Sequence, residues 1–185
     1  MDMADILKGA KTIVTLIIIF TLIVAIATIF DLPGYLATDT EQLSADNATS
    51  KALIVYDPGI MGMGLRTAYW MGEDLRTRGY DVNLSGIRSG DIENATGYEV
   101  VIVIGPTYFG GPTGPISAYL KQVQTKPGAR VGVYAVSGLL GDDASREMRK
   151  VLEDRSVIVK SAGSVSAWDR GAEEKSYAFI FSMME

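Results

Sequence analysis

The sequence predicts an α/β domain, an open sheet of parallel strands with helices on both faces, that follows one membrane-spanning helix. Three short apolar runs bounded by turn residues are typical of strands buried on both faces, and they occupy residues 52–56, 100–104 and 131–136. Amphipathic helical patterns separate these runs, as they do in the strand–helix–strand units of a parallel sheet. A run of nineteen residues without a charge, 12–30, precedes all of them.

The composition limits the chemistry that the chain can perform by itself. Its 185 residues include no Cys and no His, and the formal net charge is −5. This excludes disulfides, a thiolate nucleophile and the commonest acid–base side chain and metal ligand. A basic stripe is also missing, so nucleic acid is not an expected partner. We therefore expect no metal site and no catalytic side chain, and favour a protein that carries a cofactor.

Residues 12–30 are predicted to form a transmembrane helix behind an N-terminal flank, 1–11. A helix of this length spans about 28 Å, close to the hydrocarbon thickness of a bilayer. The alternative is a cleaved signal peptide, because residues 25–27 (A-I-A) have the small-x-small pattern of a cleavage site. The apolar run continues past that site, which favours an uncleaved, single-pass anchor.

The orientation of this anchor rests on two lysines. Lys8 and Lys11 precede the apolar run, and the next basic residue is Lys51. The positive-inside rule then places the domain outside the cytoplasm. Two N-A-T tripeptides, 47–49 and 94–96, fit glycosylation acceptors and suit this location. A cytoplasmic domain stays open as the alternative.

Residues 31–50 are predicted to be a flexible acidic linker, and the domain is predicted to occupy 51–185. The segment 31–50 has no periodic apolar pattern, and Pro33 and Gly34 end the apolar run.

The first strand, 52–56, leads through a glycine-rich turn, 57–67, into an amphipathic helix that ends near Gly79. A turn of this kind points backbone N–H groups at the helix start, where phosphate groups bind. The residues expected to hold a phosphate are Gly59, Gly62, Gly64, Arg66 and Thr67.

The rest of the chain continues the alternation of strands and helices. The predicted elements are strands at 80–84, 99–104, 131–136 and 157–159, and helices at 116–123, 144–152 and 173–184. Residues 161–168 are predicted to be the exit loop of the fifth strand.

The loop at residues 105–115 reads G-P-T-Y-F-G-G-P-T-G-P and resembles the flavin-contacting loop of the flavodoxin-like family, which includes short-chain flavodoxins and FMN-dependent reductases. The resemblance covers roughly residues 51–165. It implies a flavodoxin-like open five-stranded parallel sheet of order 2-1-3-4-5, with FMN at the carboxyl ends of the strands. The residues that it places against the flavin ring are Pro106, Thr107, Tyr108, Phe109, Gly110, Ser137, Gly138, Leu139 and Gly141.

The phosphate loop departs from the family pattern and leaves two functions open. Flavodoxins carry Ser and Thr hydroxyls there, whereas this chain has Pro58, Ile60, Met61 and Met63. The leading hypothesis is a membrane-tethered protein that binds FMN and passes electrons to or from a membrane-associated partner, such as a redox protein or a quinone. The second is a flavodoxin-like module that has lost FMN binding and serves as a membrane-anchored interaction or sensor domain.

Overall fold

The computed structural model describes residues 3–90, 92–108, 110–138 and 144–185, and it divides into two compact units. The first unit, Met1–Phe30, consists of helix α1 (Met3–Ile29). Within it, Lys8–Thr28 is long and apolar enough to cross a membrane, with a mean hydropathy of 2.5. This candidate span overlaps most of the predicted one, and the helix extends back into the predicted flank.

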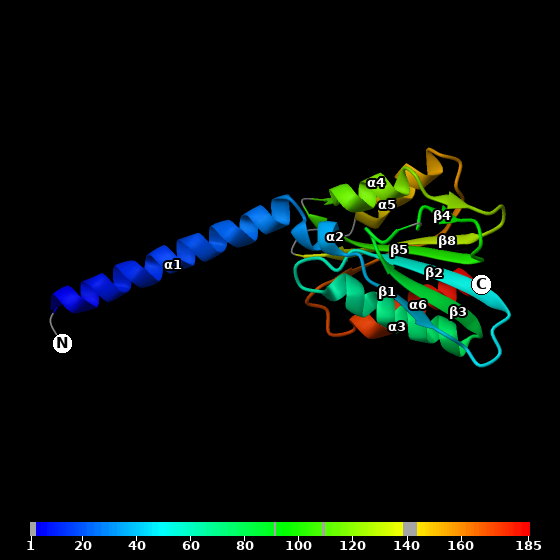
Figure 1. The fold of residues 1–185 in the computed structure, drawn as a ribbon, viewed down its shortest axis with the longest axis horizontal. Helices are drawn as coiled ribbons and strands as arrows, with labels where there is room; N and C mark the ends of the chain where they lie inside the picture. Colours follow the sequence, from blue (N-terminus) through cyan, green and yellow to red (C-terminus); the bar gives the residue numbers. More distant parts are fainter. Residues whose placement is uncertain (1–2, 91, 109, 139–143) are drawn as a thin grey trace. The chain divides into compact units, whose positions relative to one another are not determined.

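The second unit, Asp31–Glu185, is built on one sheet of strand order β1-β3-β2-β5-β8-β9 (Figure 1). Its strands are β1 (Thr40–Leu43), β2 (Ser50–Tyr56), β3 (Tyr80–Gly86), β5 (Val100–Tyr108), β8 (Arg130–Ser137) and β9 (Val159–Ser166). Strands β3, β2, β5, β8 and β9 pair in parallel, which confirms the predicted order 2-1-3-4-5. Strand β6 (Gly111–Pro112) turns back antiparallel onto β5, and β4 (Asn94–Ala95) pairs with β7 (Gln124–Thr125).

Helices cover both faces of this sheet, as predicted (Figure 1). One core lies under α4 (Gly114–Leu120) and α5 (Ala144–Glu153), and the other lies under α3 (Met63–Thr77) and α6 (Ala172–Met184). Helix α6 packs closely on β8 because Gly132 has no side chain: a Cβ there would stand 2.7 Å from Met183 Sδ. The ring of Phe179 meets Tyr134 edge to face at 4.9 Å.

The fifth strand was predicted at 157–159, but β9 begins at Val159 and runs through the predicted exit loop to Ser166. Its sequence, V-K-S-A-G-S-V-S, is rich in small residues and lacks the apolar run of a buried strand. The small residues are needed because large side chains of the neighbouring elements cover them. A Cβ on Gly163 would stand 2.8 Å from the ring of Tyr134.

The prediction that residues 31–50 form a flexible linker is wrong. They contain helix α2 (Leu32–Leu36) and β1, which pairs antiparallel with β3. The connection between them is also fixed, since the Arg88 amide donates to the Ala37 carbonyl at 2.8 Å. Strand β1 escapes a pattern search because it is an exposed edge strand whose single apolar residue is Leu43. Backbone pairing, which no sequence pattern displays, supports it. The domain therefore begins at Asp31.

Candidate functional site

The turns that follow β2, β5 and β8 meet at the carboxyl edge of the sheet, where parallel sheets place their ligands. They surround a hollow of about 70 Å³. The predicted cofactor residues that line it are Gly59, Pro106, Tyr108, Ser137 and Gly138. The structure thus brings together the three loops that the sequence singled out.

The other predicted cofactor residues do not line this hollow. Arg66 is exposed on the first turn of α3, and Thr67 is fully buried, with a hydroxyl that has no hydrogen-bond partner among the described residues. Of the remaining glycines of this set, Gly62 directly precedes α3 and Gly64 lies in its first turn. Thr107 is buried and Gly110 forms the β5–β6 turn. Phe109, Leu139 and Gly141 lie outside the described residues.

A phosphate cradle needs free backbone amides, and the turn after β2 uses four of its amides internally. The Gly59 amide donates to Asp57 Oδ1 at 2.9 Å, and the Ile60 amide donates to the Tyr108 hydroxyl at 3.2 Å. The amides of Gly62 and Gly64 donate to the carbonyls of Gly59 and Pro58, both at 3.1 Å. A bound phosphate would have to break one of these bonds to use any of these four amides.

The loops after β2 and β5 also touch each other. A Cβ on Gly59 would stand 3.2 Å from Cβ of Pro106, and the φ of this glycine is +63°. Small-molecule sites occupy roughly 300–1,000 Å³, whereas the hollow between these loops holds about 70 Å³. The described residues therefore leave too little room here for a whole FMN, and four amides of the turn are already engaged, so we derive no chemistry through that cofactor.

Two buried carboxyl groups lie beneath this turn. Asp31 precedes α2 and Asp57 follows β2, with side chains 3% and 0% exposed. An Oδ2 atom of each lies 2.5 Å from the point where a Cβ on Gly34 would stand, so both carboxyls share the space beside that glycine. The Thr113 hydroxyl, from the start of α4, donates to Asp57 Oδ2 at 3.0 Å. Asp57 thereby joins α2, the turn after β2 and α4.

Burial is the main reason why the pKa of Asp57 rises to about 8, followed by its hydrogen bond with Asp31 and the charge of that neighbour. The Gly59 amide and the Thr113 hydroxyl act in the opposite direction. Its raised pKa therefore favours the protonated form of Asp57 at neutral pH. The sequence analysis missed this pair because it assigned Asp31 to a flexible linker. The available signal was a carboxylate directly after each of two apolar runs.

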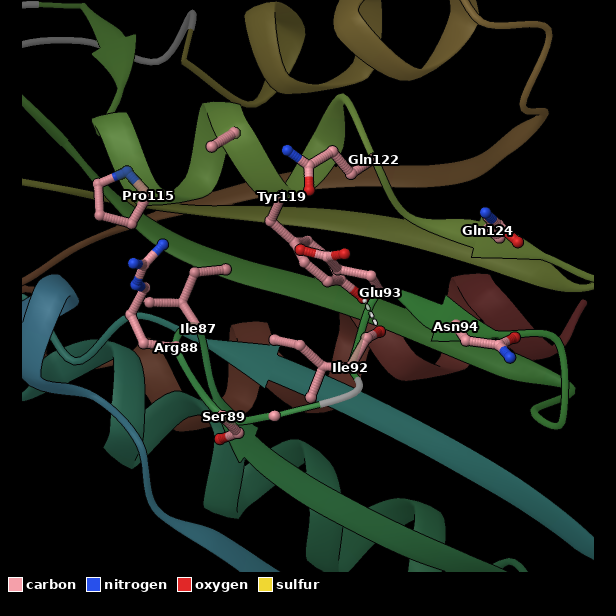
Figure 2. Close-up of a pocket in the computed structure, with 12 residues that line it drawn as sticks. Ile87, Arg88, Ser89, Ile92, Glu93, Asn94, Pro115, Tyr119, Gln122 and Gln124 are labelled. Atoms are coloured by element: carbon pink, nitrogen blue, oxygen red, sulfur yellow. Dashed lines mark hydrogen bonds between the residues drawn. The ribbon is translucent and has the colours of Figure 1, made fainter.

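A second, wider groove of about 790 Å³ lies between α4 and the segment that follows β3, of which residue 91 is not described (Figure 2). The Tyr119 side chain reaches across it, and its hydroxyl donates to the Ile92 carbonyl at 3.1 Å. Its polar side chains are Arg88, Ser89, Glu93, Asn94, Gln122 and Gln124. None of the predicted site residues lies here, and these groups suit hydrogen-bonded recognition rather than catalysis.

Comparison with known proteins supports the fold and not the function. No family model matches the chain, and no curated protein does. The two-electron reduced flavodoxin of Megasphaera elsdenii has a TM-score of 0.61 at 14% identity, covering 72% of this chain and 99% of that one. An NADH:FMN oxidoreductase in its apo form has a TM-score of 0.55 at 17% identity, covering 73% and 88%.

The rubredoxin oxygen:oxidoreductase of Desulfovibrio gigas has a TM-score of 0.59 at 17% identity, covering 74% of this chain and 36% of that one. A flavodiiron core from Synechocystis is likewise matched over 37% of its length. The chain thus spans little more than a third of these two proteins. Together with the strand order, the likenesses show that Asp31–Glu185 has the flavodoxin fold.

Proposed function

We propose that the chain is a membrane-anchored flavodoxin-fold module that serves as an interaction or sensor domain and does not hold FMN through its first loop. The observation that carries this proposal is the internal use of the amides of Gly59, Ile60, Gly62 and Gly64. A phosphate dianion would also enter close to the Asp31–Asp57 pair, whose negative charge opposes it.

The anchor of this module is the apolar segment Lys8–Thr28 of α1. Its 21 residues extend about 31 Å as a helix, which matches the hydrocarbon thickness of a bilayer. Lys8 and Lys11 at its start favour a cytoplasmic N-terminus and an extracytoplasmic domain.

The second candidate is the membrane-tethered electron carrier that uses FMN and exchanges electrons with a redox protein or a quinone. The specific observation in its favour is the hollow at the carboxyl edge, which Gly59, Tyr108 and Gly138 line from three different loops. For this function the turn after β2 would have to exchange its internal hydrogen bonds for bonds to the cofactor.

Titration with two flavins separates the candidates. FMN and riboflavin share the ring, and only FMN carries a phosphate. With the full chain in detergent micelles, we expect neither flavin to lose fluorescence on addition of protein. Binding of either flavin overturns the proposal. A preference for FMN of about 100-fold or more, the scale of charge-assisted hydrogen bonds to the phosphate, would in addition establish a phosphate cradle.

A further inference from the structure

Among the described residues of the domain, most of the exposed large apolar side chains gather at one end of the sheet. Those at the carboxyl edge are Leu32, Tyr35, Leu36, Ile60, Met61 and Trp168, with exposed fractions between 40% and 77%. We name this set the apolar rim. In monomeric proteins a contiguous patch of this kind marks an interaction site.

Contacts within the candidate site hold together the elements that carry the apolar rim. Helix α2 carries the first three, and the Asp31–Asp57 contact holds α2 against the turn that carries Ile60. Met61 and Ala167 line the same hollow, which brings Trp168 to the other side of that turn. These links place the members of the rim along the carboxyl edge.

We infer that the apolar rim rests on the lipid bilayer in which the chain is anchored. The inference depends on the anchor part of the proposed function. Its main support is the length of the connection, because the apolar run ends at Phe30 and Asp31 is already buried in the domain. Only Asp31 separates the apolar run from Leu32, the first residue of the rim, and successive Cα atoms are about 3.8 Å apart.

The chemistry of the rim and its surroundings fits a lipid surface. Trp and Tyr are the side chains enriched at the headgroup level of membranes. Arg66 and Arg170 are exposed and follow Met61 and Trp168 closely in the sequence, and the Arg88 guanidinium lies 5.5 Å from the ring centre of Tyr35. Apolar side chains together with arginines are the pattern of a surface that inserts shallowly and meets lipid phosphates.

Polarity-sensitive labels test this placement in the full chain. Since the sequence has no Cys, a single Met61→Cys or Ile158→Cys variant can be labelled at one site. Ile158 is the matched control, because it is 84% exposed and lies next to the start of β9, at the opposite edge of the sheet. In vesicles of phosphatidylcholine and phosphatidylglycerol, we expect the label at residue 61 to shift to the blue and the label at residue 158 to emit as in water.

The two tryptophans provide a second readout. Trp70 lies half-buried on α3, whereas Trp168 belongs to the rim. In lipids brominated near the headgroup, emission from Trp168 in the Trp70→Phe variant should fall roughly twofold or more, the result of shallow insertion. Emission from Trp70 in the Trp168→Phe variant should stay unchanged.

Three results would overturn the inference. These are no blue shift at residue 61, a shift that appears equally in detergent and grows with protein concentration, and equal quenching of both tryptophans. The second would identify another copy of the chain as the occupant of the rim. If alkaline carbonate releases the chain from the vesicles, the anchor itself fails, and the proposed function fails with it.

Discussion

The two edges of the sheet distribute charge in opposite ways. At the carboxyl edge the carboxyls of Asp31 and Asp57 are buried and apolar side chains are exposed. At the amino edge the carboxylate of Glu99 is exposed and paired: it accepts a hydrogen bond from Ser50 at 2.7 Å and lies 3.5 Å from Lys126. The bond from Ser50, then the charge of Lys126, keeps the pKa of Glu99 below its usual value.

This difference separates a surface that water solvates from one that needs a partner. Exposed ion pairs contribute little to stability, because water solvates each partner almost as well. A buried carboxyl pair is sensitive to any change in its protonation or in the volume around it, because no water is available to compensate. Substitutions at the carboxyl edge should therefore have large and pH-dependent effects, and those at the amino edge should not.

The largest effect is expected for Gly34→Ala. Its Cβ would stand 2.5 Å from oxygens of both Asp31 and Asp57, and neither carboxyl has open space to move into. We expect the free energy of unfolding to fall by about 1–3 kcal/mol or more, the cost of overpacking a buried site. Urea unfolding of the domain, followed by circular dichroism, measures this loss.

Gly97→Ala is the matched control for this substitution. A Cβ at Gly97 meets nothing within 4 Å, and its φ does not lie in the left-handed region. We expect a change within about 0.5 kcal/mol. Equal effects of the two substitutions would contradict the tight packing around the carboxyl pair.

The second effect is a pH dependence that Asp57→Asn should remove. The folded domain raises the pKa of Asp57 from 3.8 to about 8. Between these two pH values the folded domain therefore keeps a proton on Asp57 that the unfolded chain has released. Stability from this group is complete below about pH 4 and is lost as the pH rises toward 8, with a slope of at most about 1.4 kcal/mol per pH unit. The side-chain amide of the variant keeps a donor for Asp31 and an acceptor for Gly59 or Thr113, without titrating.

Urea midpoints at four pH values between about 5 and 8 test this prediction. The wild-type midpoint should fall across the series relative to that of Asp57→Asn, with the difference largest at the highest pH. Asp169→Asn is the control, because the hydrogen bond from Lys175 lowers the pKa of that exposed carboxyl and removes it from this pH range. If the Asp57→Asn variant keeps the wild-type slope, Asp57 is not the titrating group.

The smallest effect is expected at the amino edge, for Lys126→Ala. This substitution removes an exposed partner of Glu99, and the Ser50 hydroxyl continues to bind that carboxylate. We expect no measurable shift of the urea midpoint at physiological salt. A shift comparable to that of Gly34→Ala would remove the contrast between the two edges.

Much of the fold could be predicted from the sequence because its central strands have a clear apolar pattern. The run 100–104 is fully buried in β5 between two helical layers, so it is apolar throughout. The edge strand β1 and the small-residue strand β9 could not be predicted, since backbone pairing and large neighbours define them. Sequence patterns reveal the strands whose side chains are buried, but they do not reveal a strand that is held mainly by backbone pairing.

The sequence predicted that the loops of the candidate site would meet, but not how they would contact one another. Gly59, Tyr108 and Gly138 do meet at one hollow, because the carboxyl ends of parallel strands must converge. The sequence could not reveal that the Tyr108 hydroxyl accepts a hydrogen bond from the Ile60 amide or that Asp31 lies against Asp57. Both contacts join segments far apart in the chain, and the second depends on the position of α2.

Strand β1 decides how the domain can be prepared for experiments. A fragment cut at Lys51, where sequence patterns place the domain boundary, would strip β1 from β3 and leave a seven-residue strand with unsatisfied amides and carbonyls along its open side. Unprotected edges of this kind recruit strands from other molecules, so such a fragment should aggregate. A fragment that starts at Asp31 keeps the short strand β1, with the charged Glu41, paired along the open side of β3.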